Sequence, residues 1–318
     1  MSERIVVCLA CCRPESFKVW YSKWKYLFNK HSVDVIVSWD TEVKTPRAKG
    51  VKFLTRDTFP RHIPKGSSAC RSAAVKYAYD IGYDIYIFLD DDVFPWEGSD
   101  QIQAYIDGFQ VTPKNPGYYD VGNNFLSPKQ YTRGFPYKER HMTPVVAQYG
   151  GWDNVPDLDA RDTKIEIDRD GALRQYHFED KIEVVPKYQG FTGCFMNCAF
   201  RHEVVPCLYH LYMGTKHVNY DRFDDIWAGL ILKRVCDHMG WTILINGKAT
   251  CWHDRASNPV KSVFQEQVGH KFNEDLWDDL MSIMLYKDNN VIECYDRLKQ
   301  ALPYSQIPKA RDWIESFK

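Results

Sequence analysis

The chain has 318 residues, enough for one large α/β domain or two small ones with a sizeable hydrophobic core. Hydrophobic residues make up 44% and charged residues 26%, as in a soluble globular protein, and no apolar run is long enough to span a bilayer. A formal net charge of −1 gives no overall attraction to nucleic acid or to membranes. The ten cysteines are more simply interpreted as reduced thiols of a cytoplasmic protein than as a disulfide framework.

Residues 5–110 alternate between apolar, strand-like runs and helix-like segments. This alternation predicts a parallel, doubly wound sheet with helices on its faces. The predicted strands cover residues 5–10, 33–39, 51–54 and 85–89, and the predicted helices cover residues 14–28, 67–80 and 98–110.

Three consecutive carboxylates, Asp90, Asp91 and Asp92, follow the predicted strand at residues 85–89. Like charges this close raise one another's pKa, and a divalent cation would relieve that cost. Alternation along the backbone puts Asp90 and Asp92 on one side and Asp91 on the other. Such an Asp-x-Asp pair suits Mg²⁺ or Mn²⁺ holding a diphosphate. An acidic loop or a helix N-terminus is the alternative, but a buried strand just before the acids favours a metal–nucleotide site.

The pattern is less regular in residues 112–180, which are rich in Pro, Gly, Tyr and Asp and are typical of a functional loop or lid. Arg133 and Arg140 stand out there, although each taken alone fits an ordinary surface residue. Beyond this segment we predict strands at residues 190–200 and 241–245, helices at residues 203–213 and 222–238, and a helical tail from about residue 272.

Further candidate site residues lie at the ends of predicted elements. Asp40 follows an early strand, where an acid often meets a ribose or a base, and a structural cap is the alternative. Asp224 and Asp225 lie where a helix N-terminus favours acids, so capping and chemistry are both open. His253 also follows a strand and is either a packed histidine beside Trp252 or a ligand of the cation at the Asp triplet.

Taken together, these stretches resemble the reversibly glycosylated polypeptides of plants, a family that includes the UDP-arabinopyranose mutases. The matching pieces occur in the family's order over roughly residues 5–260, and Arg140 falls on a second family arginine. They are Ser-Ser-Ala-Cys-Arg at 67–71, Asp-Asp-Asp at 90–92, Arg-Gly-Phe-Pro at 133–136, Asn-Val-Pro-Asp-Leu-Asp-Ala at 154–160, Phe-Met-Asn-Cys-Ala-Phe at 195–200, Arg-Phe-Asp-Asp-Ile-Trp-Ala-Gly at 222–229, Cys-Asp-His at 236–238 and His-Asp-Arg-Ala-Ser-Asn-Pro at 253–259.

The resemblance implies a glycosyltransferase-A-type fold, in which a mixed, mostly parallel sheet is flanked by helices. It also implies Mn²⁺ or Mg²⁺ as cofactor, a UDP-sugar as substrate and the interconversion of UDP-arabinopyranose and UDP-arabinofuranose. In that family the arginine matching Arg133 becomes reversibly glycosylated, and the one matching Arg140 is also needed. We accordingly divide the chain into a nucleotide-sugar-binding catalytic domain, residues 1–270, and a helical C-terminal extension, residues 271–318.

These expectations assign roles to residues of this sequence. Asp224 and Asp225 would stabilise the electron-poor anomeric carbon or take a hydroxyl proton, and Arg133 and Arg140 complete the catalytic set. The predicted metal ligands are Asp90, Asp92 and His253, and the predicted substrate-binding residues are Asp40, Arg71, Asp90, Asp91, Asn197 and Arg255.

Two other functions stay open. A relative with the same core could transfer a sugar from UDP to an external acceptor such as a polysaccharide, a protein or modified DNA. A non-catalytic scaffold is disfavoured because the acids, Arg133 and His253 are all retained. The sugar, the acceptor and assembly into a homo-oligomer are not fixed by the sequence.

Overall fold

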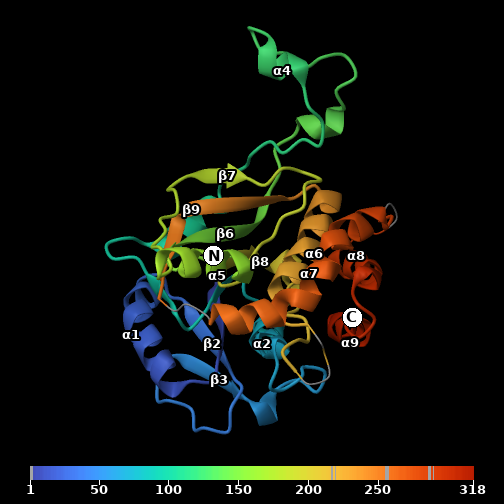
Figure 1. Ribbon diagram of the computed structural model, residues 1–318. Helices are drawn as coiled ribbons and strands as arrows, with labels where there is room; N and C mark the ends of the chain where they lie inside the picture. Colours follow the sequence, from blue (N-terminus) through green and yellow to red (C-terminus); the bar gives the residue numbers. More distant parts are fainter. Residues whose placement is uncertain (1–2, 216–217, 219, 255–257, 286–287, 289) are drawn as a thin grey trace.

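The computed structural model describes residues 3–215, 218, 220–254, 258–285, 288 and 290–318. Over these residues the chain forms a nine-stranded sheet in the order β3-β2-β1-β4-β8-β6-β9-β5, and β7 pairs with β9 beside this path (Figure 1). The strands are β1 (Ile5–Cys11), β2 (Asp34–Trp39), β3 (Val51–Thr55), β4 (Ile85–Leu89), β5 (Val93–Pro95), β6 (Val145–Asn154), β7 (Ile182–Val184), β8 (Asn197–Arg201) and β9 (Thr242–His253).

The first half of the sheet is parallel, as the sequence predicts. β1 pairs in parallel with β2 and β4, and β2 pairs in parallel with β3. β8 is antiparallel to both β4 and β6, whereas β6 and β9 are parallel to each other. The carboxyl ends of β1 to β4, β6 and β9 therefore lie at one edge of the sheet. This arrangement confirms the predicted mixed, mostly parallel sheet flanked by helices.

Both faces of the sheet are buried, which explains why its strands are nearly continuous apolar runs. In β1, Val6 and Cys8 belong to the hydrophobic core on one face, whereas Ile5, Val7 and Leu9 belong to the core on the other. Alternate side chains of an extended strand point to opposite faces, so one short run supplies both cores.

Helices cover both faces of the sheet (Figure 1). Trp20 of α1 and Tyr105 of α3 are buried in the core on one face, and Trp227 of α6 is buried in the core on the other. The helices are α1 (Pro14–Lys30), α2 (Arg71–Ile81), α3 (Gln101–Gly108), α4 (Val121–Phe125), α5 (Ala160–Asp170), α6 (Asp224–Met239), α7 (Pro259–Ser282), α8 (Val291–Leu298) and α9 (Ile307–Glu315).

The helical tail packs on the same core as α2 and α6. Leu280 of α7, Tyr295 of α8 and Trp313 of α9 are all fully buried in it. The domain boundary predicted between residues 270 and 271 falls inside α7, which is continuous from Pro259 to Ser282.

Four stretches differ from the sequence prediction. The strand predicted at residues 190–200 begins only at Asn197, the first residue of β8. The irregular segment 112–180 contains the long strand β6 and the helix α5. The helix predicted at residues 203–213 is wrong: only a short 3₁₀ helix, His202–Cys207, forms there. Pro206 lies inside it, and proline lacks the backbone N–H that a continuing helix needs. The strand predicted at residues 241–245 is longer and ends at His253.

Residues 118–140 form an arm that projects from the body of the molecule and carries α4 (Figure 1). Asp120 ties the arm together: its Oδ1 atom accepts hydrogen bonds from the backbone N–H of Gly122 and from both the N–H and the hydroxyl of Thr132, at 3.1, 3.1 and 2.8 Å.

All ten cysteines lie in the described part of the chain and are free thiols, as the sequence predicts. Among the described helices, none combines the length and the apolar character needed to cross a membrane.

Candidate active site

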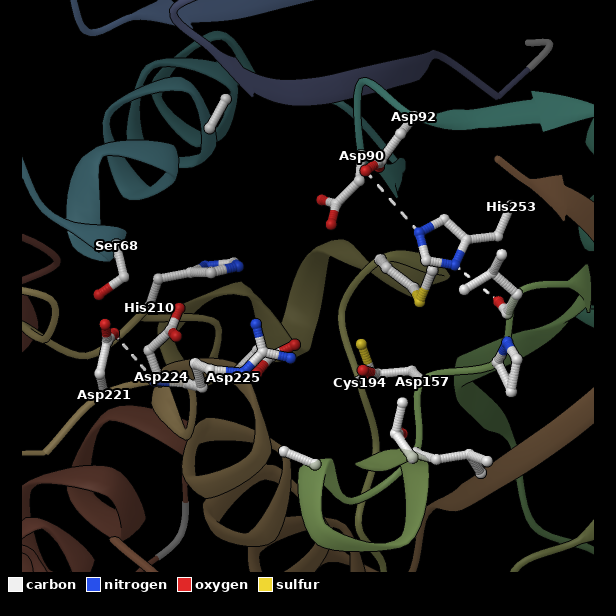
Figure 2. Close-up of a pocket in the computed structure, with 18 of the residues that line it drawn as sticks. Ser68, Asp90, Asp92, Asp157, Cys194, His210, Asp221, Asp224, Asp225 and His253 are labelled. Atoms are coloured by element: carbon white, nitrogen blue, oxygen red, sulfur yellow. Dashed lines mark hydrogen bonds and ion pairs between the residues drawn. The ribbon is translucent and has the colours of Figure 1, made fainter. Parts of the chain in front are cut away.

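A cavity of about 420 Å³ opens at the edge of the sheet where the parallel strands end (Figure 2). Ala10 of β1, Asp90 just after β4, Val155 just after β6 and His253 at the end of β9 all line it. The N-termini of α2 and α6 complete the wall. This is where ligands bind in open α/β sheets, because loops and helix N-termini converge there.

Asp92 and His253 face each other across one side of the cavity (Figure 2). The Nε2 atom of His253 lies 3.7 Å from Oδ2 of Asp92. Its other ring nitrogen, Nδ1, lies 2.7 Å from the carbonyl oxygen of Val155 and donates to it. Because Nδ1 is engaged with this carbonyl oxygen, Nε2 is the ring nitrogen that faces Asp92.

The pairing of β5 with β9 explains how residues so distant in sequence meet. β5 begins at Val93, directly after the Asp triplet, and Val93 lies opposite His253 in the antiparallel pair. A further hydrogen bond runs from the backbone N–H of Asp254 to the carbonyl oxygen of Asp92, at 3.1 Å.

Asp90 lies beside Asp92 and is held by Arg71, the first residue of α2. Arg71 is buried and donates one Nη atom to Asp90 and the other to the carbonyl oxygen of Phe195, at 2.9 Å for the latter. Burial raises the pKa of Asp90, and Asp92 and Asp91 raise it further against the lowering effect of Arg71. Burial lowers the pKa of His253, but its contacts with Asp92 and Val155 and the charge of Asp90 raise it above the ordinary value.

Asp224 and Asp225 line the opposite side of the cavity at the N-terminus of α6. Asp225 Oδ2 accepts the backbone N–H of Phe195 at 2.8 Å. Burial raises the pKa of Asp224 well above its ordinary value, and the adjacent Asp225 adds to this. Burial, followed by the charge of Asp157, also raises the pKa of Asp225. Neither carboxylate caps α6 from the N-cap position, which is Phe223.

The cavity wall also contains residues that the sequence analysis did not single out: Asp157, Cys194, His210, Asp221 and Arg222. Asp157 and Arg222 lie within two of the matched motifs, so their positions offered a signal. His210 offered none, since it stands alone in an apolar run that the sequence predicts to be helical.

Several predicted substrate-binding residues do not line the cavity. Asp40 accepts hydrogen bonds from Arg56 Nε at 2.6 Å and from the backbone N–H of Gly66 at 2.7 Å. Asp91 pairs with Arg13, whose Nε atom donates to Asp91 Oδ2 at 3.0 Å.

Asn197 is buried in the sheet and supports it. Its Nδ2 atom donates to the carbonyl oxygens of Gly151 and Ala249 at 2.8 and 2.9 Å, and its Oδ1 atom accepts the hydroxyl of Tyr105 at 2.9 Å. Arg255 lies outside the described residues.

The two predicted catalytic arginines lie on the projecting arm and are not among the residues that line the cavity. Arg133 is exposed. The guanidinium of Arg140 lies over the rings of Tyr131 and Tyr137, 4.5 and 4.0 Å from their centroids, and donates to the carbonyl oxygen of Phe135 at 2.9 Å.

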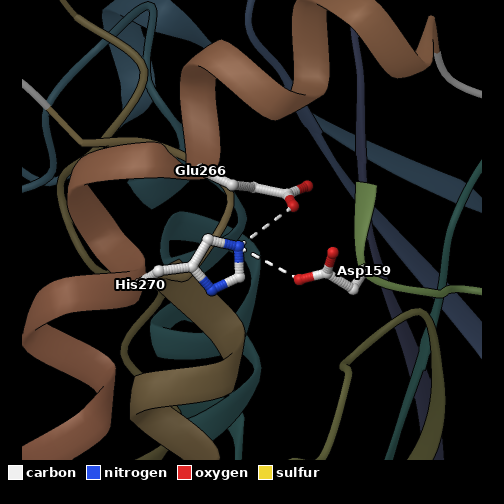
Figure 3. A group of neighbouring side chains, drawn as sticks. All are labelled: Asp159, Glu266 and His270. Atoms are coloured by element: carbon white, nitrogen blue, oxygen red, sulfur yellow. Dashed lines mark ion pairs between the residues drawn. The ribbon is translucent and has the colours of Figure 1, made fainter. Parts of the chain in front are cut away.

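A second histidine–carboxylate group joins α5 to α7 and supports the cavity from outside (Figure 3). His270 Nε2 lies 3.1 Å from Asp159 Oδ2 and 3.6 Å from Glu266 Oε2. Glu266 also accepts the backbone N–H of Ala160 at 3.1 Å and Nε of Arg222 at 2.7 Å. We call Asp159, Glu266 and His270 the α5–α7 clamp. Since Ala160 and Arg222 both line the cavity, this clamp holds part of the cavity wall in place.

Comparison with known proteins identifies the family. The profile described as "Reversibly glycosylated polypeptide" matches residues 2–306. The chain belongs to this family. The resemblance seen in the sequence motifs is thereby confirmed, and it extends beyond the region those motifs cover.

Two curated relatives of this chain are plant proteins. The chain is 27% identical to "Probable UDP-arabinopyranose mutase 1" of Pisum sativum, over 87% of this chain and 78% of the relative. It is 30% identical to "Probable UDP-arabinopyranose mutase 4" of Arabidopsis thaliana, over 76% and 68%. Among solved structures, S. aureus TarS aligns with 99% of this chain at 10% identity and a TM-score of 0.42, and the chain spans 54% of that longer protein.

Proposed function

We propose that this protein is a metal-dependent UDP-sugar mutase that interconverts UDP-arabinopyranose and UDP-arabinofuranose. The observation that carries the proposal is the cavity itself, in which Asp90, Asp92 and His253 lie on one side and Asp224 and Asp225 on the other. Family membership and the names of the relatives supply the substrate.

The donor atoms on the first side fit a divalent cation. Two carboxylates from an Asp-x-Asp pair suit Mg²⁺ or Mn²⁺, and His253 Nε2 faces them as a third donor. The hydrogen bond from His253 Nδ1 to Val155 orients the ring as ligating histidines are usually oriented. When bound, the cation neutralises the diphosphate and stabilises the departing UDP.

The second side of the cavity supports proton handling at the sugar. Converting a pyranose to a furanose requires UDP to leave the anomeric carbon and another sugar hydroxyl to attach there and lose its proton. The ring oxygen then leaves that carbon with a proton, and UDP returns to it. The raised pKa of Asp224 lets its carboxyl group keep a proton that it can donate. Asp225 already accepts the Phe195 N–H and is the candidate proton acceptor. Arg71 and Arg222 bring positive charge to the same wall, next to the acids.

Incubation with UDP-arabinopyranose and Mn²⁺, followed by chromatography of the nucleotide sugars, tests the proposal. The expected product is UDP-arabinofuranose, formed without an added acceptor. Release of UDP that depends on an added acceptor would replace the mutase with a glycosyltransferase. Absence of both turnover and nucleotide binding would contradict an enzymatic function.

We extend the proposal to self-glycosylation of Arg133, on the basis of family membership. Because Arg133 is exposed on the arm and does not line the cavity, transfer to it is separable from isomerisation. We expect Arg133→Lys to isomerise the substrate at the wild-type rate while gaining no sugar mass by intact-protein mass spectrometry. Arg161→Lys, which alters an exposed arginine of α5, is the control and should still gain sugar. Loss of isomerisation in Arg133→Lys alone would make the arginine part of the reaction.

A further inference from the structure

His210 is held rigidly in the cavity wall by its neighbours. It is only 4% exposed. Its ring lies against Phe88 and Phe195, with centroid distances of 5.7 and 5.3 Å, and the contact with Phe195 is edge-to-face. The backbone N–H of His210 donates to Ser72 Oγ of α2 at 3.1 Å, which fixes the chain beneath the ring.

Among the described residues, the only polar contact of this ring's polar edge is with the backbone of Leu208, and it does not meet hydrogen-bond geometry. Neither ring nitrogen makes a well-directed hydrogen bond within the described residues, although both nitrogens are buried. Figure 2 shows the ring pointing into the cavity, between Asp90 and Asp224. Buried polar groups without partners are rare and costly, so a pair of them aimed into a cavity indicates a ligand that supplies the missing bonds.

The charges around His210 select the kind of ligand. The carboxylates of Asp221 and Asp225 line the same part of the cavity and would repel a phosphate group, whereas a protonated Asp224 can donate to a hydroxyl. A neutral, hydroxyl-rich group suits this part instead. Burial lowers the pKa of His210 well below its ordinary value, and the charge of Arg71 acts in the same direction. A neutral imidazole offers one N–H donor and one acceptor, which is what a sugar hydroxyl can use.

We propose that His210 binds a hydroxyl group of the sugar carried by the nucleotide, at the end of the cavity opposite the Asp92–His253 pair. This inference rests on the proposed function, because it takes the ligand to be a UDP-sugar. It adds a sugar-binding residue to the cavity, one that recognises the sugar without contacting the diphosphate.

Calorimetric titration of the full chain with UDP and with UDP-arabinopyranose, both with Mn²⁺, tests the inference. The variant is His210→Phe, which keeps an aromatic ring between Phe88 and Phe195 but removes both nitrogens. We expect its affinity for UDP to equal that of the wild type. Its affinity for UDP-arabinopyranose should fall on the order of tenfold, because a sugar hydroxyl then faces an apolar ring.

Two further variants separate recognition from packing. His62→Phe makes the same exchange at a histidine that lies near Trp313 and outside the cavity lining, and it should bind both nucleotides as the wild type does. His210→Gln restores a donor and an acceptor and should recover part of the lost affinity. The thermal midpoint of His210→Phe should not fall, since the substitution removes buried nitrogens that lack partners in the free protein.

The possible failures differ in what they overturn. If His210→Phe binds both nucleotides as tightly as the wild type, or loses affinity for both to the same extent, His210 does not recognise the sugar, whereas the proposed function is untouched. If the wild-type protein binds neither nucleotide, the proposed function is wrong and this inference falls with it.

Discussion

The aspartates of the cavity have the same side chain in different surroundings. These surroundings decide whether each carboxyl group is suited to bind a cation or to hold a proton. Asp90 has Arg71 as a charged partner, whereas Asp224 has mainly another carboxylate beside it. Burial raises the pKa of both groups, but only Asp224 has a pKa well above the ordinary value. Asp90 is thereby suited to a charged role beside a cation, and Asp224 to holding a proton.

Replacing Asp224 tests this division. In Asp224→Asn we expect kcat for isomerisation to fall on the order of 100-fold while the affinity for UDP changes little, because Asn keeps the shape but cannot transfer a proton. In the wild type, activity should fall as the pH rises through the raised pKa of Asp224, since the proton is then lost. A pH profile of kcat with both proteins measures this.

Stability provides the control for this substitution. A carboxyl group whose pKa is higher in the folded than in the unfolded protein costs stability once the pH exceeds the unfolded value, 3.8. Asn is neutral at every pH and removes this cost, so Asp224→Asn should unfold at neutral pH with no lower a midpoint than the wild type. A large drop in the midpoint would contradict the assignment of a protonated Asp224.

Single residues were predictable where a local pattern marked them. The Asp triplet follows an unmistakable buried strand, and Asp224 and Asp225 begin a helix. His210 was not predictable, because only the long-range packing of its segment against Phe88 of β4, Phe195 and Ser72 of α2 brings it to the cavity. The sequence likewise gave no sign that Asn197 would be committed to the backbone of two neighbouring strands.

At the scale of elements, strand pairing and helix contacts assemble the site. The parallel strands β1 to β4 were predictable because their alternation with helices is local in sequence. β6 and α5 were not: β6 carries adjacent glycines, Gly150 and Gly151, where added side chains would collide with Tyr105 and Phe178. Glycine is unfavourable inside strands, so these two residues weaken the sequence pattern that would predict a strand. The close packing around β6 nevertheless requires them.

The end of α1 is joined to the start of α3 by one carboxylate. Asp100 caps α3 by accepting the backbone N–H of Gln103 at 3.0 Å. It also pairs with Lys30 at 2.7 Å and with His31 at 2.8 Å at the end of α1. Partial burial opposes ionisation, but these three contacts lower the pKa of Asp100 below its ordinary value.

Two substitutions at Asp100 separate capping from charge. We expect Asp100→Ala to cost about 1 kcal/mol of unfolding free energy through loss of the cap. Asp100→Asn keeps a capping oxygen and should cost only about 0.5 kcal/mol through loss of the exposed ion pairs. Because the folded pKa is depressed, the wild-type advantage is complete above the unfolded value of 3.8 and is lost as the pH falls through the folded value. Denaturant unfolding between pH 6 and 3 measures both effects. If Asp100→Asn loses the same unfolding free energy as the wild type when the pH falls, the pH-dependent loss does not come from Asp100.

At the scale of the whole molecule, the cavity draws on segments from Ala10 to Pro259, so it exists only in the assembled fold. The helical tail packs on the hydrophobic core. The α5–α7 clamp holds Ala160 and Arg222 of the cavity wall through Glu266. The arm with Arg133 and Arg140 stands apart from this body (Figure 1). The family resemblance, and no local pattern, assigned these arginines to the reaction, and no local pattern in the sequence indicated that their segment projects.

The central claim is that a cation held by Asp90, Asp92 and His253 carries the diphosphate of UDP. Calorimetric titration of UDP into metal-free protein, with and without Mn²⁺, tests it most directly, using the wild type and Asp92→Asn, with Asp168→Asn on the exposed face of α5 as control. We predict that Mn²⁺ strengthens UDP binding to the wild type and to Asp168→Asn by at least tenfold, and that Asp92→Asn loses this gain. UDP binding that is equally tight without metal, or unchanged in Asp92→Asn, would contradict the claim.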